Sequence, residues 1–314
     1  SHVCRSTLTV KEVCVTRFIL GRPSPMSIAV VTGANRIPGI GYEIARGLAH
    51  RLPQGSSVLL TARVADIGKT AAETLKKEVG EKVKVLFHQL DIADPKSVDD
   101  LRDYISKEFG GIDILVNNAG MSFPIQDKTP FNEQARRTVD VNYYGTKRML
   151  TILRPLLKPN ARSVGISSAA GKLEGSWSES WKTKLLSESL TVEDLDQIAE
   201  DFVAAANEGQ HKDKGFPGSA YGTSKTLMTQ LHRVMAKEVP PALLCSVCPG
   251  LCRTEMATGR GTFMSNVLWL ASFLVGGSAE YGADTPLYLC LELPESEFKT
   301  VHGRFLERRE VKDF

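Results

Sequence analysis

Short apolar runs alternate with longer amphipathic stretches from Met26 onward. The runs SIAVVTG, SSVLLTAR, KVKVLFHQLDI and DILVNNAG are separated by stretches such as GYEIARGLAHRL and SVDDLRDYISKEFG, where apolar residues recur every three or four positions. A nearly continuous apolar run is typical of a strand buried on both faces, and the longer period is that of a helix. Regular alternation of the two predicts a parallel sheet with helices on both faces and right-handed crossovers.

The alternation continues to the C-terminus without an internal repeat or a linker. We expect a helix over 131–157, a strand over 161–168, a helix from about Ser219, a strand over 242–250, a helix over 280–291 and a short strand over 303–307. The sequence therefore predicts one α/β domain over 26–314, a doubly wound parallel sheet or Rossmann fold. Two insertions interrupt it: a helical segment over 172–218 and an irregular, apolar segment over 253–278.

The first 25 residues do not share this pattern. They are basic, and Arg17 interrupts the apolar letters VCVTRFIL, so the stretch does not have the form of a secretory signal. We expect residues 1–25 to be an extension outside the domain, either disordered, an expression remnant, an alternative start or a targeting segment such as a mitochondrial presequence.

Charge and cysteine content narrow the class of protein. The 39 basic and 36 acidic residues leave a net charge of +3, which does not favour a nucleic-acid partner. Of the six cysteines, three lie in CSVCPGLC, which is neither a disulfide framework nor a complete set of zinc ligands. We therefore expect buried, reduced thiols, no metal site, and a cytoplasmic location.

A glycine-rich segment connects the first predicted strand to the first predicted helix. It reads VTGANRIPGIG and places Gly33, Gly39 and Gly41 at the turn. Without side chains there, the backbone can approach a pyrophosphate, and the helix N-terminus favours its negative charge. A glycine pattern alone can also be a tight turn, but this one has the strand and helix that a dinucleotide site requires.

The second predicted strand indicates which dinucleotide is bound. It ends in LLTAR, and no carboxylate follows until Asp66, whereas an NAD site usually has an acid at this point to bind the ribose 2′-hydroxyl. Arg63 occupies that position, and Arg36 lies in the glycine-rich segment. Guanidinium groups suit the 2′-phosphate of NADP(H), so we expect this cofactor. The alternative for Arg63 is an exposed surface arginine.

Tyr221 and Lys225 are four residues apart in YGTSK and so lie on one face of a helix. A tyrosine with its ordinary pKa of about 10 transfers protons poorly near neutral pH. A nearby ammonium group favours the phenolate and is expected to lower that pKa, so that Tyr221 can act as a general acid. The spacing by itself also occurs by chance.

Two further polar residues are candidates for the same site. Ser168 ends the predicted strand ARSVGISS, where a hydroxyl can bond a substrate oxygen and orient the tyrosine; the alternative is a helix cap. Asn142 is an amide within an apolar-faced helix, suited to holding a water molecule; the alternative is a buried amide with its hydrogen bonds satisfied.

Taken together, these motifs resemble the short-chain dehydrogenase/reductase family. The resemblance rests on the glycine-rich segment, Asn117-Asn118-Ala119-Gly120, Asn142, Ser168 and the Tyr221/Lys225 pair, in that order, and spans nearly all of 26–314. It implies that Ser168, Tyr221 and Lys225 are catalytic and that Asn142 extends a proton relay through water to Lys225. It implies cofactor contacts from Gly33, Asn35, Arg36, Gly39, Ile40, Gly41, Arg63, Asp91, Ile92, Asn118, Ala119, Gly120, Tyr221, Lys225, Pro249, Gly250 and Thr254.

Within that family the chain is similar to the monomeric carbonyl reductases. The long separation of Ser168 from Tyr221, and the segments FHQLDI, FGGIDILVNNAG and GFPGSAYGTSK, carry this similarity. It implies a protein that reduces ketones, aldehydes or quinones with NADPH. It also implies a monomer, because the insertion resembles one that covers the surface other members use to form oligomers.

The uncharged segment over 261–279 departs from that subgroup. It includes TFMSNVLWLASFLVGGS, in which Trp269 and Phe273 could line a pocket or simply pack in a helix. We expect an apolar substrate lid rather than membrane contact. Longer apolar lids resemble those of steroid or retinoid enzymes, which is an alternative function. A second alternative is a regulatory protein that binds NADP(H) without turnover.

Overall fold

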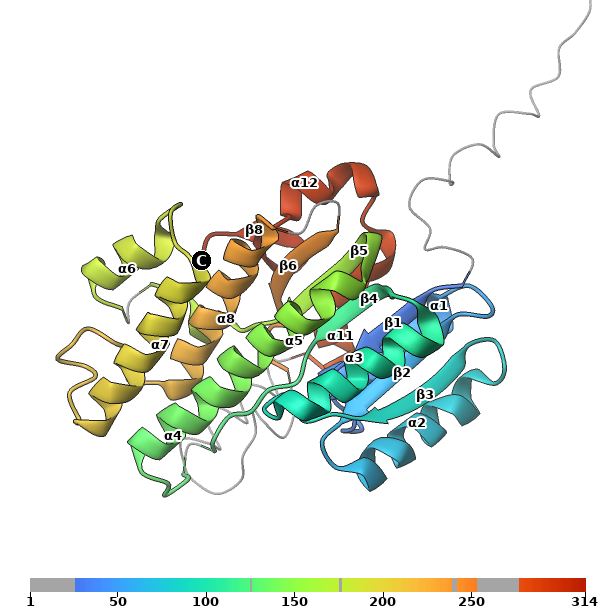
Figure 1. Ribbon diagram of the computed structural model, residues 1–314, viewed down its shortest axis with the longest axis horizontal. Coiled ribbons are helices and arrows are strands. Elements are labelled where there is room, and N and C mark those ends of the chain that lie inside the picture. Colours follow the sequence, from blue (N-terminus) through green and yellow to red (C-terminus); the bar gives the residue numbers. More distant parts are fainter. Residues whose placement is uncertain (1–25, 125, 175–176, 239–241, 253–276) are drawn as a thin grey trace, which may run out of the picture.

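A twisted sheet with helices on both faces forms the centre of the molecule (Figure 1). The computed structural model describes residues 26–124, 126–174, 177–238, 242–252 and 277–314. In these residues eight strands form one sheet in the order β3-β2-β1-β4-β5-β6-β7-β8. The strands are β1 (Ile28–Val31), β2 (Ser57–Ala62), β3 (Lys84–Gln89), β4 (Ile112–Asn117), β5 (Leu157–Ile166), β6 (Leu243–Cys248), β7 (Phe305–Glu307) and β8 (Glu310–Lys312).

Strands β1 to β7 are parallel, and β8 pairs antiparallel with β7. The sequence order reverses on either side of β1, which is the switch point where doubly wound sheets bind ligands. This confirms the predicted fold class and adds an antiparallel strand at the edge. The described site residues that follow these parallel strands therefore lie at the same end of the sheet, where the carboxyl ends of the strands meet.

Helices cover both faces of the sheet (Figure 1). One face packs against α1 (Ile40–Arg51), α2 (Ala65–Val79) and α11 (Ala279–Leu287). The other packs against α3 (Pro95–Phe109), α5 (Thr146–Leu153) and α8 (Ala220–Ala236), and α4 (Phe131–Thr138) and α7 (Val192–Asn207) pack against α8. The shorter elements are η1 (Val139–Gly145), η2 (Arg154–Leu156), η3 (Ala169–Gly171), α6 (Glu179–Leu186), η4 (Tyr288–Glu292), η5 (Glu295–Glu297) and α12 (Phe298–Val301).

The insertion before Tyr221 is helical, as expected, and consists mainly of α6 and α7. Thr191 and Asp194 form a capping box at the start of α7, each side chain bonding the backbone N–H of the other. Its apolar residues, including Ile198 and Phe202, are fully buried beside α4 and α8. The insertion is therefore an integral part of the core on this face.

Two elements differ from the sequence-based expectation. The helix predicted over 131–157 contains the π-helical segment η1 and ends at Leu156, because Leu157 already begins β5. Strand β8 is unexpected because its hairpin turn is Arg308-Arg309, with φ of 53° and 64°, where Asn and Gly are the usual signal. Arg309 is fixed there by bonds to Asp284.

Among the described residues, no helix is both long and apolar enough to cross a membrane. The predicted extension over 1–25 and nearly all of the predicted lid over 261–279 lie outside the described residues, as do Trp269 and Phe273.

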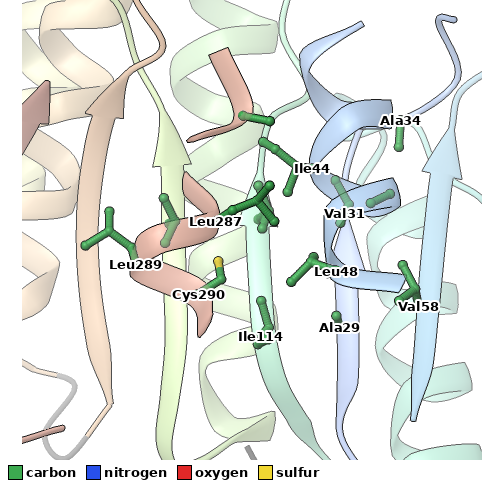
Figure 2. Close-up of a cluster of buried hydrophobic side chains, with 14 of the residues drawn as sticks. Ala29, Val31, Ala34, Ile44, Leu48, Val58, Ile114, Leu287, Leu289 and Cys290 are labelled. Atoms are coloured by element: carbon green, nitrogen blue, oxygen red, sulfur yellow. The ribbon is translucent and has the colours of Figure 1, made fainter. Parts of the chain in front are cut away.

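A close contact between α1 and α11 shows how tightly one core is packed. Ile44 and Leu48 of α1 and Leu287 of α11 lie together in the layer above β1 and β4 (Figure 2). Gly47 lies in the interior of α1, where glycine costs about 1 kcal/mol relative to alanine. A Cβ atom at this position would lie 2.4 Å from Cδ1 of Leu287. The glycine is therefore required by packing and not by the helix.

We expect Gly47→Ala to lower the free energy of unfolding, because overpacking costs about 1–3 kcal/mol and the gain in helix propensity is only about 1 kcal/mol. In a Leu287→Ala background the steric conflict is gone, so the same substitution should raise the free energy of unfolding. Urea unfolding of the four proteins measures both effects. Stabilisation by Gly47→Ala in the natural background would contradict this account.

Candidate active site and cofactor groove

The glycine-rich segment lies directly against the end of β4. Gly33 has a φ of 66°, and a Cβ atom there would be 2.9 Å from Cα of Ala119. A Cβ atom on Gly41 would be 2.3 Å from Nδ2 of Asn118. Both glycines are therefore needed for a close approach of two backbone segments, in addition to the access that they give a ligand.

The hydroxyl of Thr32 joins the ends of β1 and β4. Its Oγ1 accepts hydrogen bonds from the backbone N–H groups of Asn118 and Ala119, at 2.9 and 2.8 Å. The side chain of Asn118 also bonds the segment after β1: its Nδ2 donates to the carbonyls of Thr32 and Gly33 at 2.8 and 3.1 Å. Sequence reasoning assigned no role to Thr32, although its place before the first glycine was a usable signal.

Helix α1 begins beside this segment with its N-terminus free of side-chain caps. Its N-cap is Gly39, in extended conformation, which has no side chain to bond the first N–H groups of the helix. Ile40 and Asn35 are half-buried in the segment, whereas Arg36 is exposed. Uncapped N–H groups at the start of a helix of 12 residues fit the negative charge of a pyrophosphate.

The residues after β2 and β3 fit the adenosine end of a phosphorylated dinucleotide. Arg63 directly follows β2 and is exposed, and its carbonyl accepts a 3.0 Å hydrogen bond from Nε2 of Gln89. Asp91 follows β3 and its Oδ1 accepts from the N–H of Ala93. Ile92 is different, because its side chain is buried toward Gly145 and away from the edge. The exposed Arg63 fits a 2′-phosphate better than a 2′-hydroxyl.

Helix α8 brings the predicted proton donor to the end of β5. Ser219 caps the helix by accepting from the N–H of Gly222, which fixes Tyr221 in the first turn. The hydroxyl of Ser168 lies close enough to the phenol of Tyr221 to lower its pKa. Nζ of Lys225 lies 5.7 Å from the centre of the Tyr221 ring. The three predicted catalytic residues are thus brought together, although they come from two elements far apart in the sequence.

Ser168 has two roles in this arrangement. Its Oγ accepts from the N–H of Ala170, so that it caps the short helix η3 while it also lowers the pKa of Tyr221. The neighbouring Ser167 is buried and bonds Oγ1 of Thr229 at 2.6 Å. Ser168 therefore acts as a helix cap and also lies beside Tyr221, so the two interpretations of this residue are compatible.

The expected lowering of the Tyr221 pKa by Lys225 is wrong for this arrangement. Burial raises the pKa of Tyr221, and Ser168 acts in the opposite direction. Burial also lowers the pKa of Lys225 to about 8, and its Nζ donates to the Ile166 carbonyl at 2.7 Å. Burial thus disfavours the charged form of Lys225. Ser168 is the group that lowers the pKa of Tyr221 and so favours the phenolate.

Asn142 lies in the π-helical segment η1, fully buried. Its Oδ1 accepts from the N–H of Met121 at 2.7 Å, and its Nδ2 donates to the Met121 carbonyl and to Oγ of Ser224, both at 2.9 Å. Ser224 in turn donates to the carbonyl of Tyr221. Asn142 is therefore a buried amide with its hydrogen bonds satisfied, which was the alternative interpretation. Its contacts connect the segment after Gly120 to the first turn of α8.

A thiol joins the two turns that border the site after β5 and β6. Sγ of Cys248 accepts from the N–H groups of Ala169 and Gly250, at 3.2 and 3.3 Å. Gly250 has a φ of 78°, so the Pro249-Gly250 turn requires a glycine. Sequence reasoning treated this cysteine only as a buried thiol. The predicted cofactor contact Thr254 lies outside the described residues.

A glycine-rich segment suited to a dinucleotide and a tyrosine that can protonate an oxygen lie at the same end of the sheet, as they do in nicotinamide-dependent oxidoreductases. A family model described as short chain dehydrogenase matches residues 27–181. Carbonyl reductase (NADPH) 1 of Homo sapiens is 39% identical over 298 residues, covering 93% of this chain and 99% of the relative. The chain belongs to the short-chain dehydrogenase/reductase family.

Solved structures of plant reductases have the same fold. Menthone neomenthol reductase from Mentha piperita superimposes with a TM-score of 0.73 at 30% identity, covering 91% of this chain and 100% of that one. Salutaridine reductase from Papaver somniferum gives a TM-score of 0.73 at 31% identity, covering 89% and 99%.

We expect Thr32→Val to weaken NADPH binding about tenfold, because the N–H groups of Asn118 and Ala119 lose their acceptor and the segment after β4 is then no longer held against the glycine-rich segment. Thr32→Ser retains the hydroxyl and should bind within about twofold of the natural protein. Titration of NADPH fluorescence measures both affinities. Equal affinities of the two variants would show that the hydroxyl does not shape the groove.

Proposed function

We propose that this protein reduces the carbonyl group of small ketones, aldehydes or quinones with NADPH, and that Tyr221 is the proton donor. The observation that carries the proposal is the grouping of Ser168, Tyr221 and Lys225, with Nζ of Lys225 5.7 Å from the centre of the Tyr221 ring, at the end of the sheet where the glycine-rich segment lies. The printed name of the human relative, a carbonyl reductase that uses NADPH, supports both the reaction and the cofactor.

Different residues are assigned to the phosphates of the cofactor and to the oxygen of the substrate. Gly33, Gly41 and the start of α1 receive the pyrophosphate, and Arg63 and Arg36 receive the 2′-phosphate. NADPH, when bound, supplies the hydride. Tyr221 donates the phenolic proton to the oxygen that becomes an alcohol, and Ser168 stabilises the charge that develops on that oxygen.

Lys225 and Asn142 support the proton donor. Lys225 is buried, and by family resemblance it binds the nicotinamide ribose and receives protons through a water relay that Asn142 extends. The hydrogen bonds from Asn142 to Met121 and Ser224 support a positioning role for this amide, because they fix the start of α8 on which Tyr221 stands.

A monomer is supported by how the insertion is attached. Arg136 of α4 donates to Glu200 of α7 at 2.6 Å, and Tyr143 donates to Asp196 of α7 at 2.9 Å, while Lys147 also contacts Asp196. Helix α7 is thereby fastened over the surface that, by resemblance, other family members use for oligomers. One continuous sheet from β1 to β8 supports a single domain over 26–314.

The substrate class and the cellular location are the remaining parts of the proposal. An apolar substrate follows from the composition of the segment over 261–279. A cytoplasmic location agrees with the four described cysteines, which are all free and buried: Cys245, Cys248, Cys252 and Cys290.

Tyr221→Phe is expected to reduce kcat with menadione or isatin by about 1,000-fold, because general acid catalysis by a positioned side chain contributes about 100-fold to 10,000-fold. Oxidation of NADPH followed at its absorbance measures the rate. Tyr104→Phe, on α3, is the matched control and should leave kcat unchanged. A natural protein that binds NADPH but reduces neither these compounds nor a steroid ketone would indicate a regulatory protein instead.

Arg63→Gln is expected to raise the KM for NADPH about tenfold, since a charge-assisted hydrogen bond to the 2′-phosphate is worth about 1.5–3 kcal/mol. The KM for NADH should not change, because NADH has no 2′-phosphate. Arg102→Gln removes an exposed arginine of α3 and serves as the control. If Arg63→Gln changed the KM of neither cofactor, Arg63 would be a surface arginine and Arg36 the remaining candidate.

A further inference from the structure

A row of polar residues crosses the sheet beneath α8. Asn117 of β4, Gly165 of β5 and Ser246 of β6 are paired in register, so their side-chain positions lie on the same face. Ser163 lies two residues before Gly165 and so faces the same side. Exposed fractions of these side chains are 3% for Asn117, 1% for Ser246 and 0% for Ser163.

His232 of α8 lies directly over this row. It is fully buried, and Nε2 would be 2.2 Å from a Cβ atom on Gly165. Its Nδ1 is 2.8 Å from the Met228 carbonyl, and a carbonyl can only accept, so Nδ1 carries the hydrogen and Nε2 is a bare acceptor. Burial favours the same neutral form by lowering the pKa of His232 to about 4.

The polar atoms gathered here have no hydrogen-bond partner in the part of the chain that the structure describes. They are Nε2 of His232, Oδ1 and Nδ2 of Asn117, and the hydroxyls of Ser163 and Ser246. A buried polar atom without a partner costs about 1–3 kcal/mol, so leaving all of these unpaired would consume most of the stability of a domain. Something must therefore satisfy them.

We propose that an internal water molecule beside Nε2 of His232 joins the imidazole to Asn117 and Ser246 and so positions α8 on the sheet. A water molecule has two donors and two acceptors, which matches an imidazole acceptor, an amide and a hydroxyl. Asn117 and Ser246 lie on the strands on either side of Gly165, each strand about 4.8 Å from β5, so both side chains flank Nε2. Glycine is required at 165 because a Cβ atom there would lie 2.2 Å from Nε2 of His232.

This water matters for the reaction because it lies under the catalytic face of α8. His232 follows Lys225 by seven residues, two helical turns, and therefore shares its face. Lys225 donates to the carbonyl of Ile166, the residue next to Gly165. Helix α8 is thus fixed to β5 at two positions. The ammonium group of Lys225 binds at the first, and the imidazole of His232 binds through the water two turns further along.

A crystal structure of the full chain, at a resolution that shows ordered water, tests the site itself. The expected result is a water within about 2.6–3.2 Å of Nε2 of His232 and of at least one of Asn117 and Ser246. Direct contact of Nε2 with the amide or hydroxyl, or a dry space, would overturn the proposal. This outcome is independent of whether the protein reduces carbonyl compounds.

Two substitutions of equal size test the positioning role. Ser246→Thr retains the hydroxyl, whereas Ser246→Val replaces it with a methyl group. We expect Ser246→Val to lose the water and to lower kcat roughly tenfold with an unchanged KM for NADPH, since small displacements of catalytic groups reduce rates by up to about 100-fold. Ser246→Thr should retain both the water and kcat. Equal kcat values for the two variants, with the water lost only in Ser246→Val, would overturn the positioning role.

Discussion

The hydroxyl of Thr32 unites the two halves of the sheet at the point where the strand order reverses. It accepts from two consecutive N–H groups after β4, and the Asn118 amide bonds back to the carbonyls after β1. The glycine-rich segment can come this close only because Gly33 and Gly41 have no side chains. The glycine-rich segment and the proposed proton donor thus lie at the same end of the sheet, since Gly120, which follows β4, lies beside Asn142 and Lys225.

Burial shifts the pKa values of the proposed proton donor, Tyr221, and of Lys225 beside it. Both shifts disfavour the phenolate form of Tyr221. Taking Tyr221 and Lys225 out of water raises the pKa of the phenol and lowers that of the ammonium group to about 8, so burial alone disfavours the phenolate. Ser168 counters this effect on the phenol. A phenol that retains its proton until an oxygen beside it becomes basic is suited to reduction, where it must donate that proton.

Most of the fold, and the grouping of the candidate catalytic residues, could be predicted because their signals are local. Apolar runs marked the parallel strands, and the spacing of Tyr221 and Lys225 marked one face of a helix. The π-helical segment around Asn142 and the Arg308-Arg309 turn could not be predicted, because tertiary hydrogen bonds stabilise conformations that these residues do not favour by themselves. The role of Thr32 and the pKa of Tyr221 depend equally on contacts between distant segments.

A buried lysine constrains the helix that carries it. Lys225 is nearly inaccessible to water, so its helix must pack closely on the sheet, and yet that same face also carries Thr229 and His232. Apolar residues would pack there more simply. Polar groups instead bind the helix at defined points: Thr229 to Ser167, Lys225 to the Ile166 carbonyl and His232 over Gly165. Because hydrogen bonds are directional and apolar contacts are not, these bonds fix how far α8 can slide or rotate, which the position of the Tyr221 phenol requires.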